Sequence, residues 1–440
     1  TVIAGLAVSL ALVVAGALAM AGNGDVPRPS ATGIEALPPG RHDYQVTPPP
    51  RPMPVILITV DAASALRMDL HGAKRETMPR LAARARSAAV FDRAFSVGPS
   101  TRLSFPSLHS GQYVTRIEWA VSERVGAPWR NVEQTMASLF AAAGWRTEAV
   151  VPDTYFTQVM PWVTTGFQHI DTSAVRGKAG VVPNAEQVAD AALSRLAELA
   201  ALPRFLLWVH FSDAHAPYRL PDGVEPFPGG GPGDIYDREL EGVDRHLERL
   251  LDGIERLLGD RPRVVLLTAD HGQAFDARHE EHHQNHDLST AVTWIPLFVW
   301  SPFSGGKRLE RLAGTVDVLP TLLNAVGLRA EGLPGDSLLP DIAGTPWSPR
   351  PVLQQLFLPE YVARGKEPLV RAALRDGRYV LHRLVERDDE QLYDYMDDPL
   401  EERDLYATRP EVAARLRALL DLELARAGWT GPRAGDGSGL

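Results

Sequence analysis

Apolar runs and amphipathic stretches alternate along the central part of the chain. Short β-rich runs such as VILITV and RVVLLTA contain almost no polar residue. Between them, apolar residues recur every three or four positions, as in helices with one buried face. Strands that are apolar on both faces and alternate with helices form parallel sheets covered on both sides. The pattern therefore predicts an α/β fold with a largely parallel central sheet sandwiched by helices. The predicted strands are 55–60, 146–151, 205–211, 263–269 and 295–300, and the predicted helices are 78–91, 185–202, 240–258 and 315–328.

Several predicted strands end in side chains that can bind ligands. VILITV is followed by Asp61, RVVLLTA by Asp270 and His271, and FLLWVHF by a segment that contains Asp213 and His215. In open parallel sheets, ligands bind beyond the carboxyl ends of the strands. We therefore expect these side chains to gather at one edge of the sheet.

The first residues of the chain form an apolar stretch. Val2–Met20 contains one polar residue, Ser9, and no charge. A helix of this length would extend about 30 Å, the thickness of the hydrocarbon core of a bilayer. We expect residues 1–22 to be a transmembrane helix or signal anchor, and the small residues of AMAG leave a cleaved signal peptide as the alternative. The Pro- and Gly-rich residues 23–53 are then a linker to the main domain.

The pattern changes again after about residue 350. Residues 369–386 and 389–398 are typical of short antiparallel strands, and 410–428 of an amphipathic helix that begins with Pro and ends with Gly. We expect three regions: a main domain at 54–350, a small C-terminal α+β subdomain at 351–428 and a disordered tail at 429–440.

Composition excludes some kinds of function. The chain has 45 Lys and Arg against 55 Asp and Glu, a net charge of -10, which argues against a nucleic-acid-binding surface. It has no Cys, so disulfides, thiolate metal sites and Cys nucleophiles are absent. Most of its positive charge is Arg, so recognition of phosphate or sulfate would depend on Arg and His.

The strand ends offer a donor set for a divalent cation. Asp61, Asp270 and His271 supply two carboxylates and one imidazole. A site that includes imidazole favours Mn²⁺ or Zn²⁺, with Ca²⁺ or Mg²⁺ as the alternatives. Taken without other information, such residues can also be solvated polar groups at the edge of a sheet.

A second segment could supply a nucleophile. SVGPSTRLSFPSLHSGQY, residues 96–113, is rich in hydroxyl side chains and ends near the turn-forming Gly111. A hydroxyl becomes an effective nucleophile when a metal or base lowers its pKa. A helix that begins here would also favour an anionic group at its N-terminus, but Pro106 fits well only in the first turn of a helix. From the residues alone, a Ser- and Thr-rich loop is the alternative.

Taken in this order, these segments resemble the sulfatase branch of the alkaline-phosphatase-like superfamily, over roughly residues 54–428. VILITVDAASALRMDLHG resembles the first metal-ligand strand, and TMPRLAARARSAAVFDRAFSVGPSTRLSFPSLHSGQY the helix and nucleophile segment. FLLWVHFSDAHAPY is similar to a histidine-bearing strand, and VVLLTADHGQ with NHDLSTAVTWIPLFVW to the second half of the metal site. GTVDVLPTLLNAVGL and QLYDYMDDPLEERDLYATRPEVAARLRALL resemble the late helix and the C-terminal subdomain.

The resemblance implies roles for individual residues. Asp61, Asp270 and His271 match metal ligands. Counting back from SG at 110–111 places Thr101 at the nucleophile position, where its oxygen would also contact the metal.

Three further residues match the substrate side of the family's site. His215 and His286 match histidines that hold the oxygens of an ester or protonate its leaving group. Arg102 is the candidate to replace the family's motif Arg, because Phe105 stands at that position.

Other differences from the family pattern limit which reaction and how many metal ions the resemblance implies. The usual sulfatases have a Cys or Ser that is oxidised to formylglycine, and Thr101 cannot undergo this conversion. Ala62 stands where a second Asp is common. The Asp and His at 213 and 215 are two residues apart, whereas the superfamily's binuclear phosphodiesterases have four, which favours a single metal. A Thr nucleophile with an Asp–His pair looks more like the phosphoryl-handling members, including membrane-anchored phosphoglycerol and phosphoethanolamine transferases.

The resemblance thus implies a metal-dependent, sulfatase-like hydrolase that cleaves phosphate or sulfate esters through a Thr nucleophile. A membrane-anchored transferase of the phosphoglycerol or phosphoethanolamine type, which modifies lipids or envelope glycans, is the alternative. A non-catalytic relic is the third reading. The implied partners are an anionic ester, carried by a lipid or glycan, and the membrane through the N-terminal helix. The implied location is membrane-anchored, with the catalytic domain extracytoplasmic, in the periplasm or at the cell surface.

Overall fold

The computed structural model covers most of the chain after the predicted linker, and the residues it describes belong to one compact unit, Pro39–Leu440. Within these residues, no helix is both long enough and apolar enough to span a bilayer. The predicted membrane span and the predicted linker up to residue 51 lie outside the described residues, as does His286. The described residues are 52–119, 134–151, 155–174, 184–218, 220, 223–275, 287–345, 349–364, 366–385 and 389–429.

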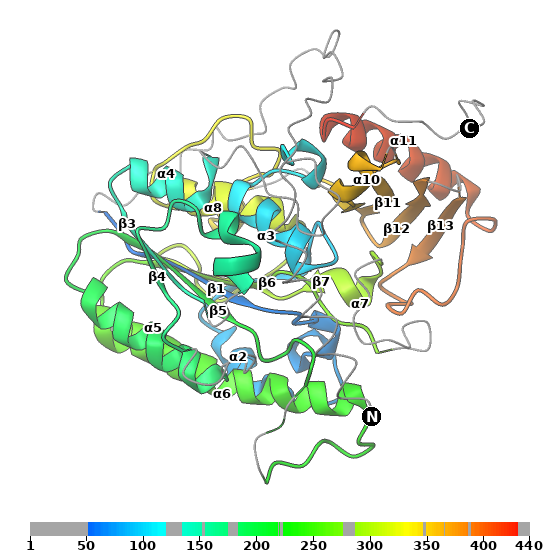
Figure 1. The fold of residues 1–440 in the computed structure, drawn as a ribbon. Helices are drawn as coiled ribbons and strands as arrows, with labels where there is room; N and C mark the ends of the chain where they lie inside the picture. The colour runs from blue at the N-terminus through cyan, green and yellow to red at the C-terminus, as the bar shows by residue number, and fades with distance from the viewer. Residues whose placement is uncertain are drawn as a thin grey trace. The chain divides into compact units, whose positions relative to one another are not determined.

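A large central sheet organises the described part of the chain (Figure 1). Its strands lie in the order β4-β3-β5-β1-β6-β8-β2-β7, and β9 pairs with β2. The pairs from β4 to β6 are parallel, whereas β8 is antiparallel to both β6 and β2. The predicted fold class, a largely parallel sheet between helices, is confirmed. The bounds of these strands are β1 Val55–Val60, β2 Ala89–Phe95, β3 Arg146–Val150, β4 His169–Asp171, β5 Phe205–Phe211, β6 Val264–Ala269, β7 Trp294–Ile295, β8 Leu297–Trp300 and β9 Lys307–Gly314.

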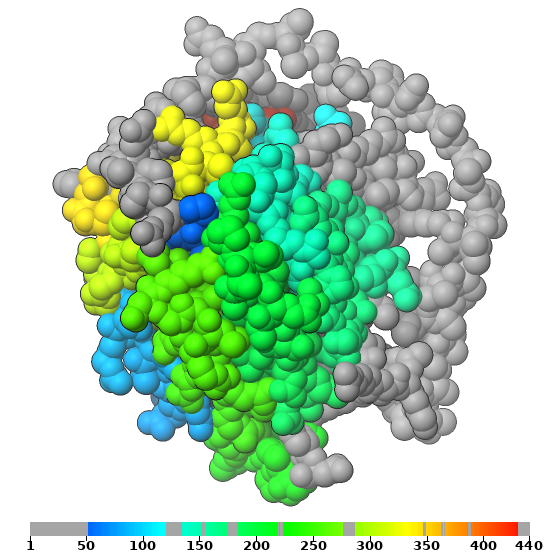
Figure 2. Space-filling model, turned by 90° about the vertical axis from the view of Figure 1, so that its left-hand side faces the viewer, coloured from blue at the N-terminus to red at the C-terminus, as the bar shows by residue number. Residues whose placement is uncertain are grey.

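Helices cover both faces of this sheet. Helices α3, α4 and α8 lie on one face, and α2, α5 and α6 on the other (Figure 1). The green helices α5 and α6 form much of the surface seen in Figure 2. The short helices α7 and α9 complete the main part of the fold. The bounds are α2 Pro79–Arg84, α3 Thr101–Ser110, α4 Met136–Ala142, α5 Ala185–Leu199, α6 Pro232–Leu258, α7 Thr290–Thr293, α8 Val318–Ala325 and α9 Leu339–Ile342.

Most observed elements follow from the sequence pattern, and two of the differences have a clear physical reason. β1 and β6 are buried along their whole length, as their unbroken apolar runs predict. The helix predicted for 78–91 is wrong in its second half, because Ala89–Phe95 forms strand β2. Its first residues, Ala89–Phe91, are buried where β2 pairs with β8 and β9, and a short buried run has no period that separates helix from strand. The second difference is Pro106, which lies inside helix α3. It removes one backbone donor without ending the helix.

A second, smaller sheet follows in the C-terminal part of the chain. Its four strands are antiparallel in the order β10-β11-β12-β13, and the long helix α11 packs against it. This sheet shares a hydrophobic cluster with the main part of the fold, which includes Phe95, Leu103, Leu374 and Leu416. The buried Arg375 lies 4.3 Å above the ring of Phe95. The small sheet is therefore packed directly onto the segment predicted to carry the nucleophile. The bounds are β10 Val352–Phe357, α10 Pro359–Ala363, β11 Leu369–Asp376, β12 Tyr379–Leu384, β13 Asp389–Asp394 and α11 Pro410–Arg426.

Candidate metal centre

Asp61 follows directly after β1, at the carboxyl edge of the sheet. Its backbone N–H donates to the carbonyl of Phe211 at 2.8 Å, which continues the pairing of β1 with β5 for one more residue. The chain then turns sharply at Ala62, which has a φ of 56°. The hydroxyl of Tyr236 holds this turn, because it donates to the carbonyl of Ala62 at 2.7 Å and accepts from the N–H of Ser64 at 2.9 Å. The side chain of Asp61 is thus presented from a fixed backbone.

Asp270 and His271 follow β6 at the same level of the sheet. Val60 and Ala269 are paired in register on adjacent parallel strands, so Asp61 and Asp270 are the next residues on each. The two strand ends are tied together, since the N–H of Ala62 donates to Oδ1 of Asp270 at 3.2 Å. The periodicity of the two strands and their register are therefore sufficient to bring the two carboxylates together.

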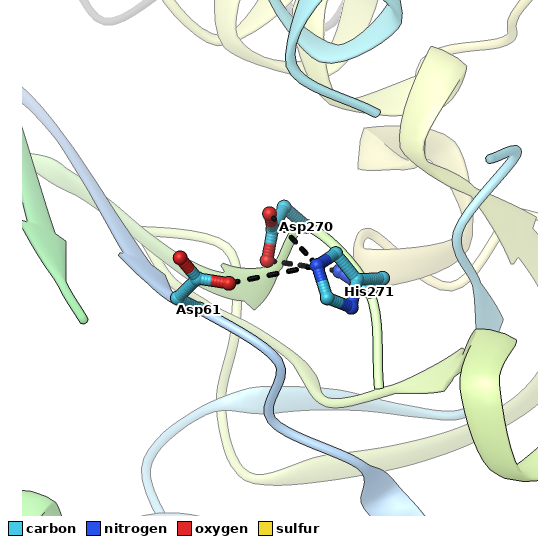
Figure 3. Close-up of side chains that lie close together, drawn as sticks. All are labelled: Asp61, Asp270 and His271. Atoms are coloured by element: carbon cyan, nitrogen blue, oxygen red, sulfur yellow. Dashed lines mark hydrogen bonds and ion pairs between the residues drawn. The ribbon is translucent and has the colours of Figure 1, made fainter. Parts of the chain in front are cut away.

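These side chains converge on one point (Figure 3). Nε2 of His271 lies 3.5 Å from Oδ1 of Asp61 and 3.6 Å from Oδ2 of Asp270. One donor atom from each residue lies within 4.8 Å of the other two, which is the spacing of ligands around a metal ion. All three residues are buried, and Asp270 is fully inaccessible to solvent.

The electrostatics of this group fit a bound cation. Burial raises the pKa of Asp270, and the charge of Asp61 raises it further. Burial also acts to raise the pKa of Asp61, but the neighbouring histidines, His215 first, outweigh it and lower the pKa. Oδ1 of Asp61 and Oδ2 of Asp270 are buried without a hydrogen-bond donor among the described residues. Two buried carboxylates with unsatisfied oxygens beside an imidazole are a donor set for one divalent cation.

Thr101 lies beside this group as the first residue of α3. Its Oγ1 is 3.3 Å from Nε2 of His271. Its backbone N–H lies at the N-terminus of a ten-residue helix, where the amide groups are free of helical partners and the helix dipole favours negative charge. The hydroxyl of Ser96 donates to the carbonyl of Asp270 and so ties the segment before α3 to the strand end that carries two of the ligands.

Two of the predicted substrate-side residues have described positions. His215 lies in the loop after β5, with Nδ1 2.6 Å from the carbonyl oxygen of Ala216, and its charge is the largest influence that lowers the pKa of Asp61. Arg102 pairs with Glu360 of the small C-terminal part, with Nη1 3.1 Å from Oε1. The roles assigned to both residues remain predictions, and His286 lies outside the described residues.

Asp213 lies outside the group of candidate metal ligands and contacts the start of helix α5. Its Oδ1 accepts a hydrogen bond from the N–H of Ala185, at the start of helix α5, at 2.6 Å. Burial raises the pKa of Asp213 to about 7. Among the described residues, the group of candidate metal ligands contains only the Asp and His residues at 61, 270 and 271. That this edge holds a single metal remains a prediction.

Sequence reasoning missed one residue at the site, His210. It is fully buried on β5, and its Nε2 lies 3.6 Å from Oδ2 of Asp61. The parallel register pairs it with Thr59, two residues before Asp61 and on the same face of the sheet. The signal was present in the sequence as a histidine inside an otherwise apolar strand, but only the order of the strands shows what it faces.

Comparisons with known proteins identify the family to which this chain is similar. The family model described as Sulfatase matches residues 54–328, more than half of the chain. A protein of Escherichia coli (strain K12) named "Putative transferase YhbX" is 24% identical over 257 residues, which cover 57% of this chain and 44% of that protein. This chain therefore aligns with less than half of the length of that relative.

Solved structures show the same fold. BT1596, a 2-O GAG sulfatase, has a TM-score of 0.67 and 19% identity, and the match covers 86% of this chain and 93% of that one. The phosphonate monoester hydrolase of Agrobacterium radiobacter has a TM-score of 0.64 and 18% identity, with 85% and 96% covered. At these identities the likeness establishes the fold and leaves the reaction to be argued from the site.

Proposed function

Since this chain belongs to the sulfatase family, we propose that it is a metal-dependent hydrolase that cleaves phosphate or sulfate esters with Thr101 as the nucleophile. The observation that carries the proposal is the position of the Thr101 hydroxyl, 3.3 Å from Nε2 of His271. A nucleophile that can touch the same cation as two buried carboxylates and an imidazole is in the arrangement that ester cleavage requires.

Asp61, Asp270 and His271 would hold the cation, with Mn²⁺ or Zn²⁺ favoured by the imidazole. When bound, a divalent cation lowers the pKa of the Thr101 hydroxyl and offsets the negative charge of the ester oxygens. The N-terminus of α3 adds its free N–H groups to the same region.

The reaction then uses groups of this chain. Oγ1 of Thr101 attacks the phosphorus or sulfur in line with the leaving oxygen, forms a new bond to it and releases its proton to water. The bond to the leaving oxygen breaks, and His215 supplies a proton to that oxygen and later regains one from water. The covalent Thr101 ester is then cleaved by water, which restores the hydroxyl and releases phosphate or sulfate.

Phosphate esters are the preferred substrates within this proposal. A Thr side chain cannot be converted to formylglycine, the group that the usual sulfatases carry at this position. Thr101 must instead release its ester to an external acceptor. Transfer of a phosphoryl group to water or to an alcohol needs only positioning and charge stabilisation.

A transferase is the second candidate, and the relative favours it, because that protein is named "Putative transferase YhbX". Here the covalent Thr101 ester would pass to an alcohol acceptor in place of water. The predicted N-terminal anchor suits both candidates, since it would hold the site at the outer surface of a membrane near lipid or glycan esters.

The test is turnover of p-nitrophenyl phosphate, bis-p-nitrophenyl phosphate and p-nitrophenyl sulfate by the purified chain with Mn²⁺ or Zn²⁺. Thr101→Ala is the inactive variant. Ser107→Ala is the matched control, because Ser107 is a buried hydroxyl on the same helix with no hydrogen-bond partner among the described residues. Phosphoester cleavage that is lost only in Thr101→Ala supports the proposal, and cleavage of the sulfate alone contradicts the phosphate preference. No turnover with metal bound would favour the transferase or a non-catalytic relic.

A further inference from the structure

His210 lies behind the metal centre at the end of a buried chain of hydrogen bonds. The indole Nε1 of Trp208 donates to Oγ1 of Thr59 at 2.9 Å. Oγ1 of Thr59 lies 2.9 Å from Nδ1 of His210. Trp208, His210 and Thr59 are each fully buried, so no solvent competes for these contacts.

The donors and acceptors of this chain fix the tautomer of His210. An indole N–H can only donate, so Oγ1 of Thr59 is the acceptor in the first bond. The hydroxyl hydrogen of Thr59 is then free to point at Nδ1 of His210, and no other acceptor for it occurs among the described residues. Nδ1 is therefore the acceptor, and the ring hydrogen of neutral His210 lies on Nε2.

That Nε2–H faces one oxygen of Asp61. Nε2 of His210 lies 3.6 Å from Oδ2, a contact longer than a hydrogen bond, whereas Oδ1 of the same carboxylate lies 3.5 Å from Nε2 of His271. The two oxygens thus have different neighbours, one on each side of the carboxylate. Oδ1 is thus the oxygen on the side of His271, another candidate metal ligand.

Aromatic rings hold the plane of His210. Phe105 and Phe156 meet its ring edge-on, with ring centres 5.1 Å and 5.0 Å away and planes at 86° and 87°. Phe105 stands at the position where the family motif has Arg, and it is fully buried in this aromatic group. Phe105, which replaces the motif Arg, is therefore one of the two rings that restrict rotation of the His210 side chain.

We propose that His210 is a positioning residue of the metal centre, whose Nε2–H, fixed by the Thr59–Trp208 hydrogen bonds, orients Asp61 so that Oδ1 faces the cation. A partner of this kind limits the rotation of a ligating carboxylate and raises metal affinity, and its loss commonly costs 10- to 100-fold in affinity. The inference rests on the metal-binding part of the proposed function.

The test measures the dissociation constant of Mn²⁺ or Zn²⁺ on metal-free protein by competition with a chelator. His210→Phe keeps the ring and removes both nitrogens, and we expect it to weaken binding by about 10- to 100-fold. His210→Gln can place an amide N–H near the position of Nε2, and we expect affinity within about threefold of the wild type. Thr59→Val removes the hydroxyl that fixes the tautomer, and we expect an intermediate loss.

His109→Phe is the matched control. His109 is also fully buried, and it packs on the same Trp208 with ring centres 4.6 Å apart, but the structure assigns it no contact with the candidate ligands. We expect its substitution to leave metal affinity unchanged. An equal loss in His109→Phe would mean that packing of the aromatic group, and not the Nε2 contact, sets the affinity, and the proposal would be wrong.

Further outcomes distinguish a positioning role of His210 from failure of the proposed function and from a role of His210 as a metal ligand. Wild-type affinity in folded His210→Phe would overturn the positioning role and leave the proposed function intact, whereas a wild-type protein that binds no metal would overturn both. Pulsed electron paramagnetic resonance of bound Cu²⁺ counts coordinated imidazoles, and we expect one in the wild type and one in His210→Gln. A fall in the number of coordinated imidazoles would make His210 a ligand and would also overturn the proposal.

Discussion

Oγ1 of Thr101 and Nε2 of His271 lie 3.3 Å apart, although 170 positions separate the two residues in the chain. Helix α3 begins at Thr101 and strand β6 ends just before Asp270 and His271. The first turn of the helix is thus held against the edge of the sheet, beside the candidate metal ligands.

The first prediction concerns Thr101 itself. We expect Thr101→Ala to lower kcat for phosphoester cleavage by about 10³-fold or more, because it removes the attacking oxygen. Thr101→Ser keeps a hydroxyl and should retain measurable turnover. Metal affinity should change little in Thr101→Ser, so steady-state kinetics and metal titration together separate loss of the nucleophile from loss of the site. Full activity in Thr101→Ala would remove Thr101 from the mechanism.

A second prediction concerns the cation. Dialysis against a chelator should abolish turnover, and Mn²⁺ or Zn²⁺ should restore it. Bound metal should also stabilise the fold, by about 2.7 kcal/mol at a concentration of 100 times Kd. Asp270→Asn should lose both effects, because it replaces a carboxylate ligand.

The matched control for Asp270→Asn is Asp213→Asn, which keeps an oxygen to accept the hydrogen bond from Ala185 and lies outside the group of candidate ligands. Thermal unfolding with and without metal is the measurement. Metal-independent turnover by the chelated wild type would contradict the prediction.

The third prediction concerns Gly272, directly after His271. A Cβ at this position would lie 2.6 Å from the carbonyl oxygen of Ala291, which is too close for any real contact. We expect Gly272→Ala to cost about 1–3 kcal/mol of stability and to weaken metal binding, since His271 must shift with it.

Gly242→Ala provides the comparison for Gly272, because a Cβ at Gly242 in α6 would meet nothing within 4 Å. There we expect a gain of about 0.5–1 kcal/mol from helix propensity. Chemical denaturation of the two variants tests the difference, and equal stability would show that the backbone near His271 can yield.

The fourth prediction is a dependence of stability on pH. Burial lowers the pKa of His109 from 6.5 to about 3, and both ring nitrogens lack hydrogen-bond partners among the described residues. Between these pH values the unfolded chain binds a proton at His109 and the folded protein does not. The contribution of neutral His109 is therefore complete above pH 6.5 and is lost as the pH falls, by about 1.4 kcal/mol per pH unit.

His109→Phe should remove this dependence. We expect the stability of the wild type to fall relative to the variant between pH 6.5 and pH 4.5, as measured by urea denaturation at several pH values. Parallel stability curves for the two proteins would show that His109 binds a proton over the same pH range in the folded and unfolded chains, and would contradict the prediction.

The fifth prediction concerns the pair formed by Arg102 and Glu360. Arg102 follows the proposed nucleophile and is held by a carboxylate 3.1 Å away. If its guanidinium also attracts the ester, Arg102→Gln should raise KM by about tenfold with a smaller effect on kcat. Glu360→Gln should lower KM, because it removes a competing negative charge. Opposite shifts in KM support a substrate role, and unchanged KM in both variants would make the pair purely structural.

Local sequence determined the fold class and the candidate ligands. The unbroken apolar runs of β1 and β6 predict a doubly covered parallel sheet, and Asp61, Asp270 and His271 stand where such strands end. In parallel strands the carboxyl ends lie at one edge, so the pattern alone is enough to expect these three side chains together. The helix predicted for 78–91 failed in its second half, because the short buried run at its end belongs to β2 and carries no period of its own.

The tertiary structure alone decided the contacts that depend on strand order and register. β5 lies next to β1, and this pairing places His210 beside Thr59 and 3.6 Å from Oδ2 of Asp61. The packing of the C-terminal part brought Glu360 to Arg102, and the hydrogen bond to helix α5 gave Asp213 its partner. These contacts depend on which distant segments pack together. Long-range packing produces no period or spacing in the sequence, so the contacts could not be predicted from it.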